Sequence, residues 1–306
     1  MNIGPQPKSD NTFTKKYRKI QSEYRANILK VPYGVGPNKN SKNQYGNMLV
    51  DGDKNGLNFI SNSAFKFAKQ KVLDKQINKN MTIEEYRLFN NMLSSMPMCF
   101  NLFSDLRELL LTNKEEVSKV VKSMFNEISW IDKVTYIDVE FIPNPISDYT
   151  DDKSAFDAMI LVEDDKGAKG LISIETKYTD LLGSNTSAKA SVKNEIITNN
   201  KIFDNELVDI LKEKGYQQIH RNYLLTYTYA KKNKFKHFAN IVISPKDDQL
   251  SLNEIEQMQK HMIEDKNTIM KIPLEIIVER AIDTGNKNIS KLMTTFKGRY
   301  FGYSKP

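Results

Sequence analysis

Residues that build disulfides and zinc sites are scarce in this chain of 306 residues, which has one cysteine and three histidines. A single cysteine, Cys99, excludes a disulfide within the chain. His220, His237 and His261 are scattered and form no close ligand pair with it, so a zinc site is not expected. Cys99 lies in an apolar segment, which predicts an inert residue of the core.

Long apolar runs are also missing. The longest are about 4–8 residues, the length of buried strands, whereas a membrane-spanning helix needs roughly 18. The opening residues, MNIGPQPKSDNTF, contain no apolar stretch like that of a secretory signal. The sequence therefore predicts a protein of the reducing cytoplasm with no membrane partner.

Charged and aromatic residues are plentiful. Lys plus Arg number 45 and Asp plus Glu number 38, which gives a formal charge of +7. With 15 Phe and 14 Tyr the chain has the means to build a core, so a wholly disordered chain is excluded. The positive charge favours an anionic partner such as nucleic acid, although a solvated surface can carry the same surplus.

The first 80 residues differ in pattern from the rest. We predict a basic amphipathic helix over 13–30, a long loop over 31–58 and a helix over 61–79. Because the loop joins two helices that each have an apolar stripe to bury, we expect residues 1–80 to form a helical extension packed on a core of residues 81–306.

Helices come first in that core. A T-I-E-E pattern at Thr82 predicts a helix running toward Ser94, and Pro97 is expected to separate it from a second helix. A further helix is predicted over 113–128.

Strands follow from about residue 133. Three runs rich in Val, Ile, Tyr and Phe predict strands: VTYIDVEFI, AFDAMILVE and GLISIETKY. Helices are predicted over 187–230 and 251–265, with a fourth strand at FANIVISP, a fifth at KIPLEIIVE and a basic helix closing the chain. This order indicates an α/β fold with a mixed sheet.

The pattern (Asp/Glu)-x-Lys occurs four times, but only Glu175-Thr176-Lys177 lies within an apolar strand. Side chains alternate along a strand, so Glu175 and Lys177 share one face and Thr176 takes the other. On the preceding strand, Asp157 falls opposite Glu175 if the turn is centred at residue 166, or opposite Lys177 if it is centred at 167. In either register the three charged side chains lie on one face and come together.

Two carboxylates and an ammonium group suit metal-dependent hydrolysis of phosphodiesters. Mg²⁺ prefers a few carboxylate oxygens and keeps its other positions for water and phosphate. It lowers the pKa of a bound water, and a neighbouring lysine can orient that water or stabilise developing charge. The alternative interpretation is a partly buried salt bridge of Asp157 or Glu175 with Lys177.

Other polar residues are secondary candidates. Gln218 and Arg221 share a face of a predicted helix, where they would contact phosphate or simply face solvent. Glu140 is a candidate third carboxylate whose register the sequence leaves open. Three polar residues in an apolar segment are expected to cap or turn the chain near Pro97 rather than line a cleft: Ser94, Ser95 and Asn101.

Basic and aromatic residues interleave in segments 15–19, 229–238 and 296–305. Such segments bind phosphates through Lys and Arg and stack aromatic rings on exposed bases. They are also found on ordinary solvated surfaces.

At Asp157, Glu175 and Lys177 the chain resembles the PD-(D/E)XK nuclease superfamily, in which the first acid lies on one strand of a hairpin and the tripeptide on the next. Phe156 replaces the proline that names the motif. A closer resemblance, to a bacterial restriction-endonuclease-like branch, has two departures: Met96 stands in place of a glutamine, and His220 in place of an aromatic residue. The similar segments are KIQSEYR (19–25), NMLSSMPMCFNLF (91–103), SAFDAMI (154–160), IETKYTD (174–180) and YQQIHRNYLL (216–225).

This resemblance implies a mixed sheet flanked by helices and a cofactor, Mg²⁺ or Mn²⁺, held by Asp157 and Glu175 with the backbone carbonyl of Thr176 as a further ligand. It implies that Lys177 positions or activates water in a DNA endonuclease of restriction or genome defence. Duplex cleavage needs two cuts, which makes a homodimer plausible. The alternatives are a catalytically inactive nucleic-acid-binding module with the same fold and a nuclease acting on RNA.

Overall fold

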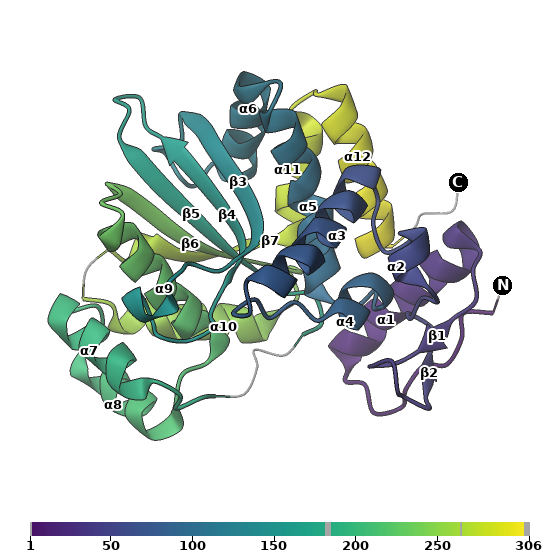
Figure 1. Cartoon of the computed structure of the whole chain (residues 1–306), viewed down its shortest axis with the longest axis horizontal. Helices are drawn as coiled ribbons and strands as arrows, with labels where there is room; N and C mark the ends of the chain where they lie inside the picture. Colours follow the sequence, from purple (N-terminus) through teal and green to yellow (C-terminus); the bar gives the residue numbers. More distant parts are fainter. Residues whose placement is uncertain (1, 181–184, 264, 303–306) are drawn as a thin grey trace.

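The computed structural model describes residues 2–180, 185–263 and 265–302, and a five-stranded sheet runs through its centre (Figure 1). The strand order is β3-β4-β5-β6-β7. The first three strands form an antiparallel meander, and β6 and β7 continue the sheet in parallel to β5. The predicted α/β fold with a mixed sheet is confirmed. The strands are β3 (Lys133–Phe141), β4 (Phe156–Glu163), β5 (Lys169–Thr176), β6 (His237–Ser244) and β7 (Ile269–Pro273).

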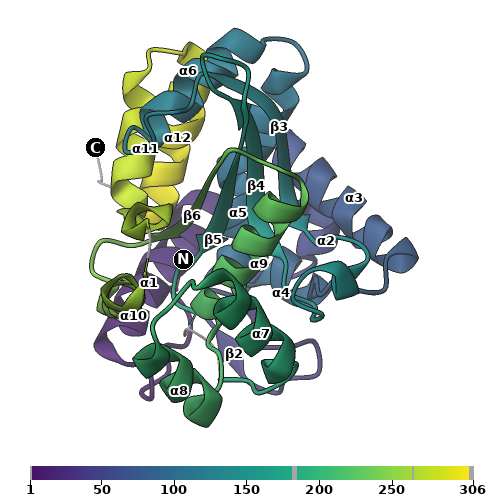
Figure 2. The same cartoon turned by 90° about the vertical axis from the view of Figure 1, so that its left-hand side faces the viewer.

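Helices cover both faces of this sheet. On one face, Ile172 and Ile174 of β5 share a buried cluster with Phe103 of α5, and on the other, Leu171 packs with Leu225 of α9. Figure 2 shows α5 and α9 on opposite sides of the strands. The helices are α1 (Thr12–Glu23), α2 (Gly52–Asn55), α3 (Asn62–Ile77), α4 (Glu85–Asn90), α5 (Ser95–Leu110), α6 (Lys114–Met124), α7 (Ala190–Asn200), α8 (Asn205–Lys214), α9 (Gln218–Lys232), α10 (Gln249–His261), α11 (Leu274–Asp283) and α12 (Lys287–Tyr300).

The register between β4 and β5 decides between the two predicted arrangements. Pairs run from Ala158↔Ile174 to Glu163↔Lys169, so the turn is centred at residue 166. Continued by one pair, this register sets Asp157 against Glu175. The end of β5 that carries the tripeptide therefore lies beside the start of β4.

Residues 2–80 pack against later parts of the chain. The Gln21 side chain on α1 donates hydrogen bonds to the Tyr178 hydroxyl and to the backbone oxygen of Arg299, both at 3.0 Å. Tyr17 and Phe59 belong to the same buried cluster as the helices and strands of the core. The division of the chain at residue 80 stays a prediction. The segment predicted as a loop contains a short hairpin, β1 (Gly34–Val35) with β2 (Gln44–Tyr45), and the helix α2.

Two local predictions were wrong. The predicted fifth strand over 271–279 ends at Pro273, and α11 begins at Leu274. Proline cannot donate to the next ladder bond, and Leu274, Ile277 and Val278 are buried at helical spacing. Pro97 also does not separate two helices, as the sequence had predicted. It lies in the first turn of α5, where a backbone N–H has no partner within the helix.

No helix among the residues described here combines the length and the apolar character needed to cross a membrane.

The contact between Gly52 and α4 gives a test of this packing. A Cβ atom at Gly52 would lie 1.9 Å from the carbonyl oxygen of Phe89, whereas one at Gly298 in α12 would meet nothing within 4 Å. We expect Gly52→Ala to destabilise the protein by about 1–3 kcal/mol through overpacking. Gly298→Ala, the control, should stabilise it by roughly 0.5–1 kcal/mol because alanine is the better helix former. Urea unfolding measures both, and equal stability of the two variants would contradict the described packing.

Candidate active site

A cleft of about 700 Å³ opens where β5 ends, and it brings the predicted site residues together. Asp157, Glu175 and Lys177 all line it, and so do Gln218 and Arg221 from the first turn of α9. The convergence expected from strand geometry is therefore present, and the catalytic roles stay predictions at this point.

Lys177 and Glu175 form a buried ion pair in this cleft. Lys177 Nζ lies 2.9 Å from Glu175 Oε1 and donates a hydrogen bond of 2.6 Å to Gln218 Oε1. Asn222, one turn further along α9, donates to Glu175 Oε2. The salt bridge considered as an alternative thus exists, and it lies inside the cleft.

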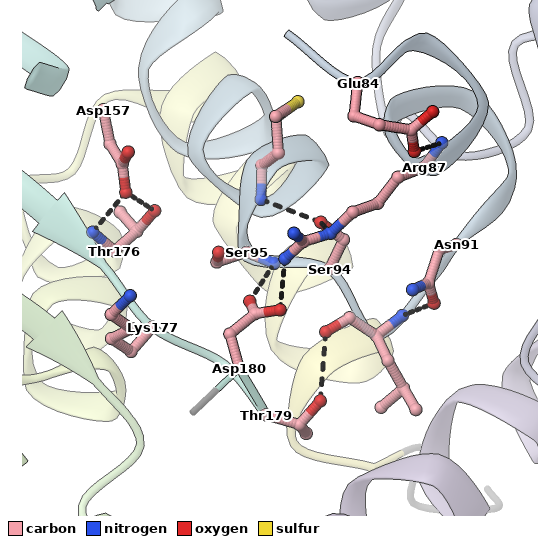
Figure 3. Close-up of polar contacts among 12 residues, drawn as sticks. Glu84, Arg87, Asn91, Ser94, Ser95, Asp157, Thr176, Lys177, Thr179 and Asp180 are labelled. Carbon is pink, nitrogen blue, oxygen red and sulfur yellow. Dashed lines mark hydrogen bonds and ion pairs between the residues drawn. The ribbon is translucent and has the colours of Figure 1, made fainter. Parts of the chain in front are cut away.

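Asp157 is held by Thr176. Both the backbone N–H and the hydroxyl of Thr176 donate to Asp157 Oδ2, at 2.8 and 2.9 Å, as Figure 3 shows. The other oxygen, Oδ1, accepts no hydrogen bond within the described part of the chain. One carboxylate oxygen is consequently fixed in place while the second is left for a ligand.

Glu140 adds a third carboxylate to the same wall. The pairs Val139↔Ala158 and Phe141↔Phe156 set Glu140 directly across from Asp157. Its φ of 53° is the left-handed conformation that side-chain-bearing residues rarely adopt. The residue is 8% exposed and lines the cleft. Three acids therefore follow one another across neighbouring strands, from β3 through β4 to β5.

Burial dominates the titration of these groups. It raises the pKa of Glu175 to about 8, with a further contribution from the charge of Asp157 and opposition from Lys177. Burial likewise raises the pKa of Glu140 to about 8, assisted by Asp157 and Glu175, and it raises the pKa of Asp157. For Lys177, burial lowers the pKa, but Glu175 and Asp157 outweigh it and the net direction is upward. If all three acids were ionised together, their negative charge would exceed what one ammonium group can balance.

This donor set fits a hard divalent cation. Asp157 Oδ1 accepts no hydrogen bond in the described ranges, and Glu175 Oε1 is buried and has only the Lys177 ion pair. In the described ranges, no three His, Cys, Asp or Glu side chains are arranged to hold a metal by themselves. Mg²⁺ is usually bound through one or two carboxylates plus water and phosphate, so a pair of acids is sufficient for it. Zinc, which is bound by three or four protein ligands, mostly Cys and His, does not match.

Several cleft residues escaped the sequence analysis. Asn222 could have been found, because it lies four residues after Gln218 on the same helix face. Arg87 of α4 and Asp180, which also line the cleft, form an ion pair between segments far apart in the sequence, so no local pattern signals them.

The secondary candidates of the apolar segment have structural roles. Ser94 caps α5, since its hydroxyl accepts from the Met96 backbone N–H at 3.3 Å. Asn101 is buried and bonds Ile60 N, Asn58 O and the Tyr300 hydroxyl. Ser95 does reach the cleft, contrary to expectation. Cys99 is buried, as predicted, and burial raises the pKa of its thiol well above the usual range.

The described residues of the interleaved basic and aromatic segments contribute no side chain to the cleft lining. Helix α9 begins at the cleft, and its last residue, Lys232, lies about 20 Å along the axis from Gln218. Lys232 pairs with Asp148, and Lys16 of the first segment pairs with Asp247. The part of the third segment from residue 303 lies outside the described residues.

The raised pKa of Glu140 predicts a pH dependence of stability in the absence of metal. An unfolded glutamate has a pKa near 4.3, and the folded value is about 8, so the native state holds a proton that the unfolded state releases. The free energy of unfolding in EDTA should therefore fall between about pH 5 and pH 8, by at most about 1.4 kcal/mol per pH unit for each such group.

Glu140→Gln should make this dependence shallower in urea unfolding, and Glu163→Gln, at the other end of the β3–β4 pair, should not. The same pH profile for wild type and Glu140→Gln would show that Glu140 does not hold its proton.

Comparison with known proteins agrees with the geometry. A family model described as the PD-(D/E)XK nuclease superfamily matches residues 8–302, nearly the whole chain. No curated protein and no solved structure matches the sequence. The match includes Asp157, Glu175 and Lys177, and the mixed sheet flanked by helices is consistent with the core of that superfamily. The chain belongs to the PD-(D/E)XK nuclease superfamily.

Proposed function

We propose that the protein is a metal-dependent endonuclease that hydrolyses phosphodiester bonds in DNA. One observation carries this proposal: in a chain of a nuclease superfamily, Asp157, Glu175 and Lys177 converge in a single cleft. A module that only binds nucleic acid would gain nothing from three charged side chains that are buried or partly buried, because removing charges from water is costly.

Asp157 and Glu175 would hold Mg²⁺ or Mn²⁺, with the backbone carbonyl of Thr176 as a further ligand. Such an ion would supply a water of lowered pKa and neutralise charge on the scissile phosphate. The N–H and hydroxyl of Thr176 keep Asp157 in one orientation. Asn222 does the same for Glu175, so that both carboxylates face the cleft before substrate arrives.

Lys177 positions the attacking water. Its ammonium group has three donors, of which one is engaged by Gln218 and one is directed to Glu175. The remaining donor is available to a water or to a phosphate oxygen beside the carboxylates. Gln218 thus acts on the lysine rather than directly on phosphate.

Arg221 contacts the substrate backbone. It lines the cleft next to Gln218, and its guanidinium has no hydrogen bond or ion pair within the described residues. Guanidinium groups bind phosphate through two parallel hydrogen bonds, which suits this place.

The biological setting is proposed on the family resemblance. A role in restriction or genome defence, in the cytoplasm, follows from the similarity to restriction-endonuclease-like proteins. A homodimer would supply the two cuts that a duplex requires.

A plasmid cleavage assay with Mg²⁺, Mn²⁺ or EDTA tests the activity. Wild type should nick or linearise the plasmid with either metal and not with EDTA. Lys177→Ala should lose at least about 10²-fold in rate, the effect of removing one group that stabilises developing charge. Asp157→Ala should still bind the plasmid without cutting it. Lys122→Ala, which removes a lysine on the surface of α6, serves as the control and should cut normally.

Equal activity of wild type and Lys177→Ala would place the chemistry elsewhere. No cleavage by either, with binding retained, would support the inactive binding module. Cleavage of RNA but not of the matching 2′-deoxy strand would instead make the protein a ribonuclease, because only RNA offers the 2′-hydroxyl.

A further inference from the structure

Arg87 is a second arginine of the cleft. It comes from α4, in the N-terminal half of the chain, whereas Arg221 comes from α9. Both line the cleft that holds Lys177, and the two helices lie on different sides of the sheet end in Figure 1. The side chain of Arg87 is 36% exposed, so its guanidinium reaches the solvent of the cleft.

The guanidinium is fixed by two segments that meet at this point (Figure 3). Arg87 Nε donates to the Ser94 hydroxyl at 2.8 Å, and Nη2 donates to Asp180. The second oxygen of Asp180 accepts the Ser95 backbone N–H at 2.9 Å, which fixes the carboxylate in turn. The residues after β5 are thereby joined to the beginning of α5.

These contacts leave part of the guanidinium unused. Arginine has five N–H donors in a planar fork, and Nη1 makes no hydrogen bond in the described ranges of the chain. Anchoring by Ser94 and Asp180 removes rotational freedom before a ligand arrives, so less entropy is lost on binding. An exposed arginine needed only for packing would not require two side chains to orient it.

The charged residues that line the cleft indicate which kind of ligand the free N–H donors of Arg87 would bind. Among the described residues, six acids line it, namely Glu84, Glu140, Asp152, Asp157, Glu175 and Asp180, against four cations, namely Arg87, Lys153, Lys177 and Arg221. These acids repel a polyanion unless cations with free donors contact it directly. Lys177 is occupied by Glu175 and Gln218, and Lys153 donates to the carbonyl of Lys79. The two arginines, which come from different helices, are the groups suited to hold the nucleic-acid backbone.

We propose that Arg87 binds a backbone phosphate next to the scissile one, and that Ser94 and Asp180 are positioning residues for its guanidinium. This inference rests on the proposed nuclease function. Arg87 and Arg221 together form a clamp that holds the nucleic-acid strand on both sides of Lys177.

The salt dependence of DNA binding tests the clamp. Fluorescence anisotropy of a labelled duplex with the full chain, in EDTA to prevent cleavage, gives the slope of log K against log salt. Each phosphate contact contributes about −0.9 to that slope. Arg87→Ala and Arg221→Ala should each make it shallower by about 0.9, and the surface variant Lys122→Ala should leave it unchanged.

Two conservative variants separate contact from positioning. Arg87→Lys keeps the charge but loses the fork, so the slope should return to the wild-type value while the affinity stays several-fold lower. Ser94→Ala should also keep the slope and lower the affinity less than Arg87→Ala does. A purely structural role would lower the melting temperature without moving the slope.

Removal of Arg87 leaves Asp180 without its cation, which would destabilise the fold or repel DNA by itself. The double variant Arg87→Gln/Asp180→Asn removes both charges and should still show the shallower slope. A wild-type slope in this folded double variant would overturn the inference, even if the protein cleaves DNA as proposed. If wild type neither binds duplex DNA or single-stranded RNA in EDTA nor cleaves either of them with Mg²⁺ or Mn²⁺, the nuclease proposal and this inference both fail.

Discussion

The burial of acidic side chains around one lysine is the constraint on which the rest of the site depends. Glu140, Asp157 and Glu175 lie on three neighbouring strands and line the cleft, where Glu140 and Glu175 are buried and Asp157 is partly buried. Such a group is costly when ionised unless a cation compensates it. Lys177 is the cation that pairs directly with one of these acids in the described part of the chain, so a positive ion that enters the cleft stabilises the arrangement. Affinity for a metal thus arises from this excess of acids.

The surrounding structure holds the acidic side chains of the site in position. Thr176 and Asn222 orient two of the carboxylates, and α5 and α9 exclude water from the two faces of the sheet. The left-handed backbone at Glu140 costs of order 1–3 kcal/mol and persists because the pairs on either side of it are fixed. Strained backbone of this kind is typical of active sites.

Local pattern was enough to predict the sheet and the core of the site. Alternation within GLISIETKY predicted the shared face of Glu175 and Lys177, and short hairpins leave few registers to choose from. The pattern gave a wrong prediction at 271–279, because a short apolar run is compatible with either a strand or a helix. In the structure the strand ends at Pro273 and a helix follows. It could not reveal Arg87 with Asp180, because that pair depends on how two distant segments pack. The predicted roles of the site residues rest on the chemistry of their functional groups and not on the fold.

Gln21 joins the first helix to the last. Its amide donates both to the Tyr178 hydroxyl and to the backbone of Arg299, near the end of the chain. During synthesis, the first helix therefore cannot form its contact with Arg299 until the residues up to that position have been added. Contacts of such long sequence separation form late in folding. The nascent chain accordingly carries its acidic cluster before its N-terminal segment has docked, and α1 completes its contacts only after α12 has been synthesised.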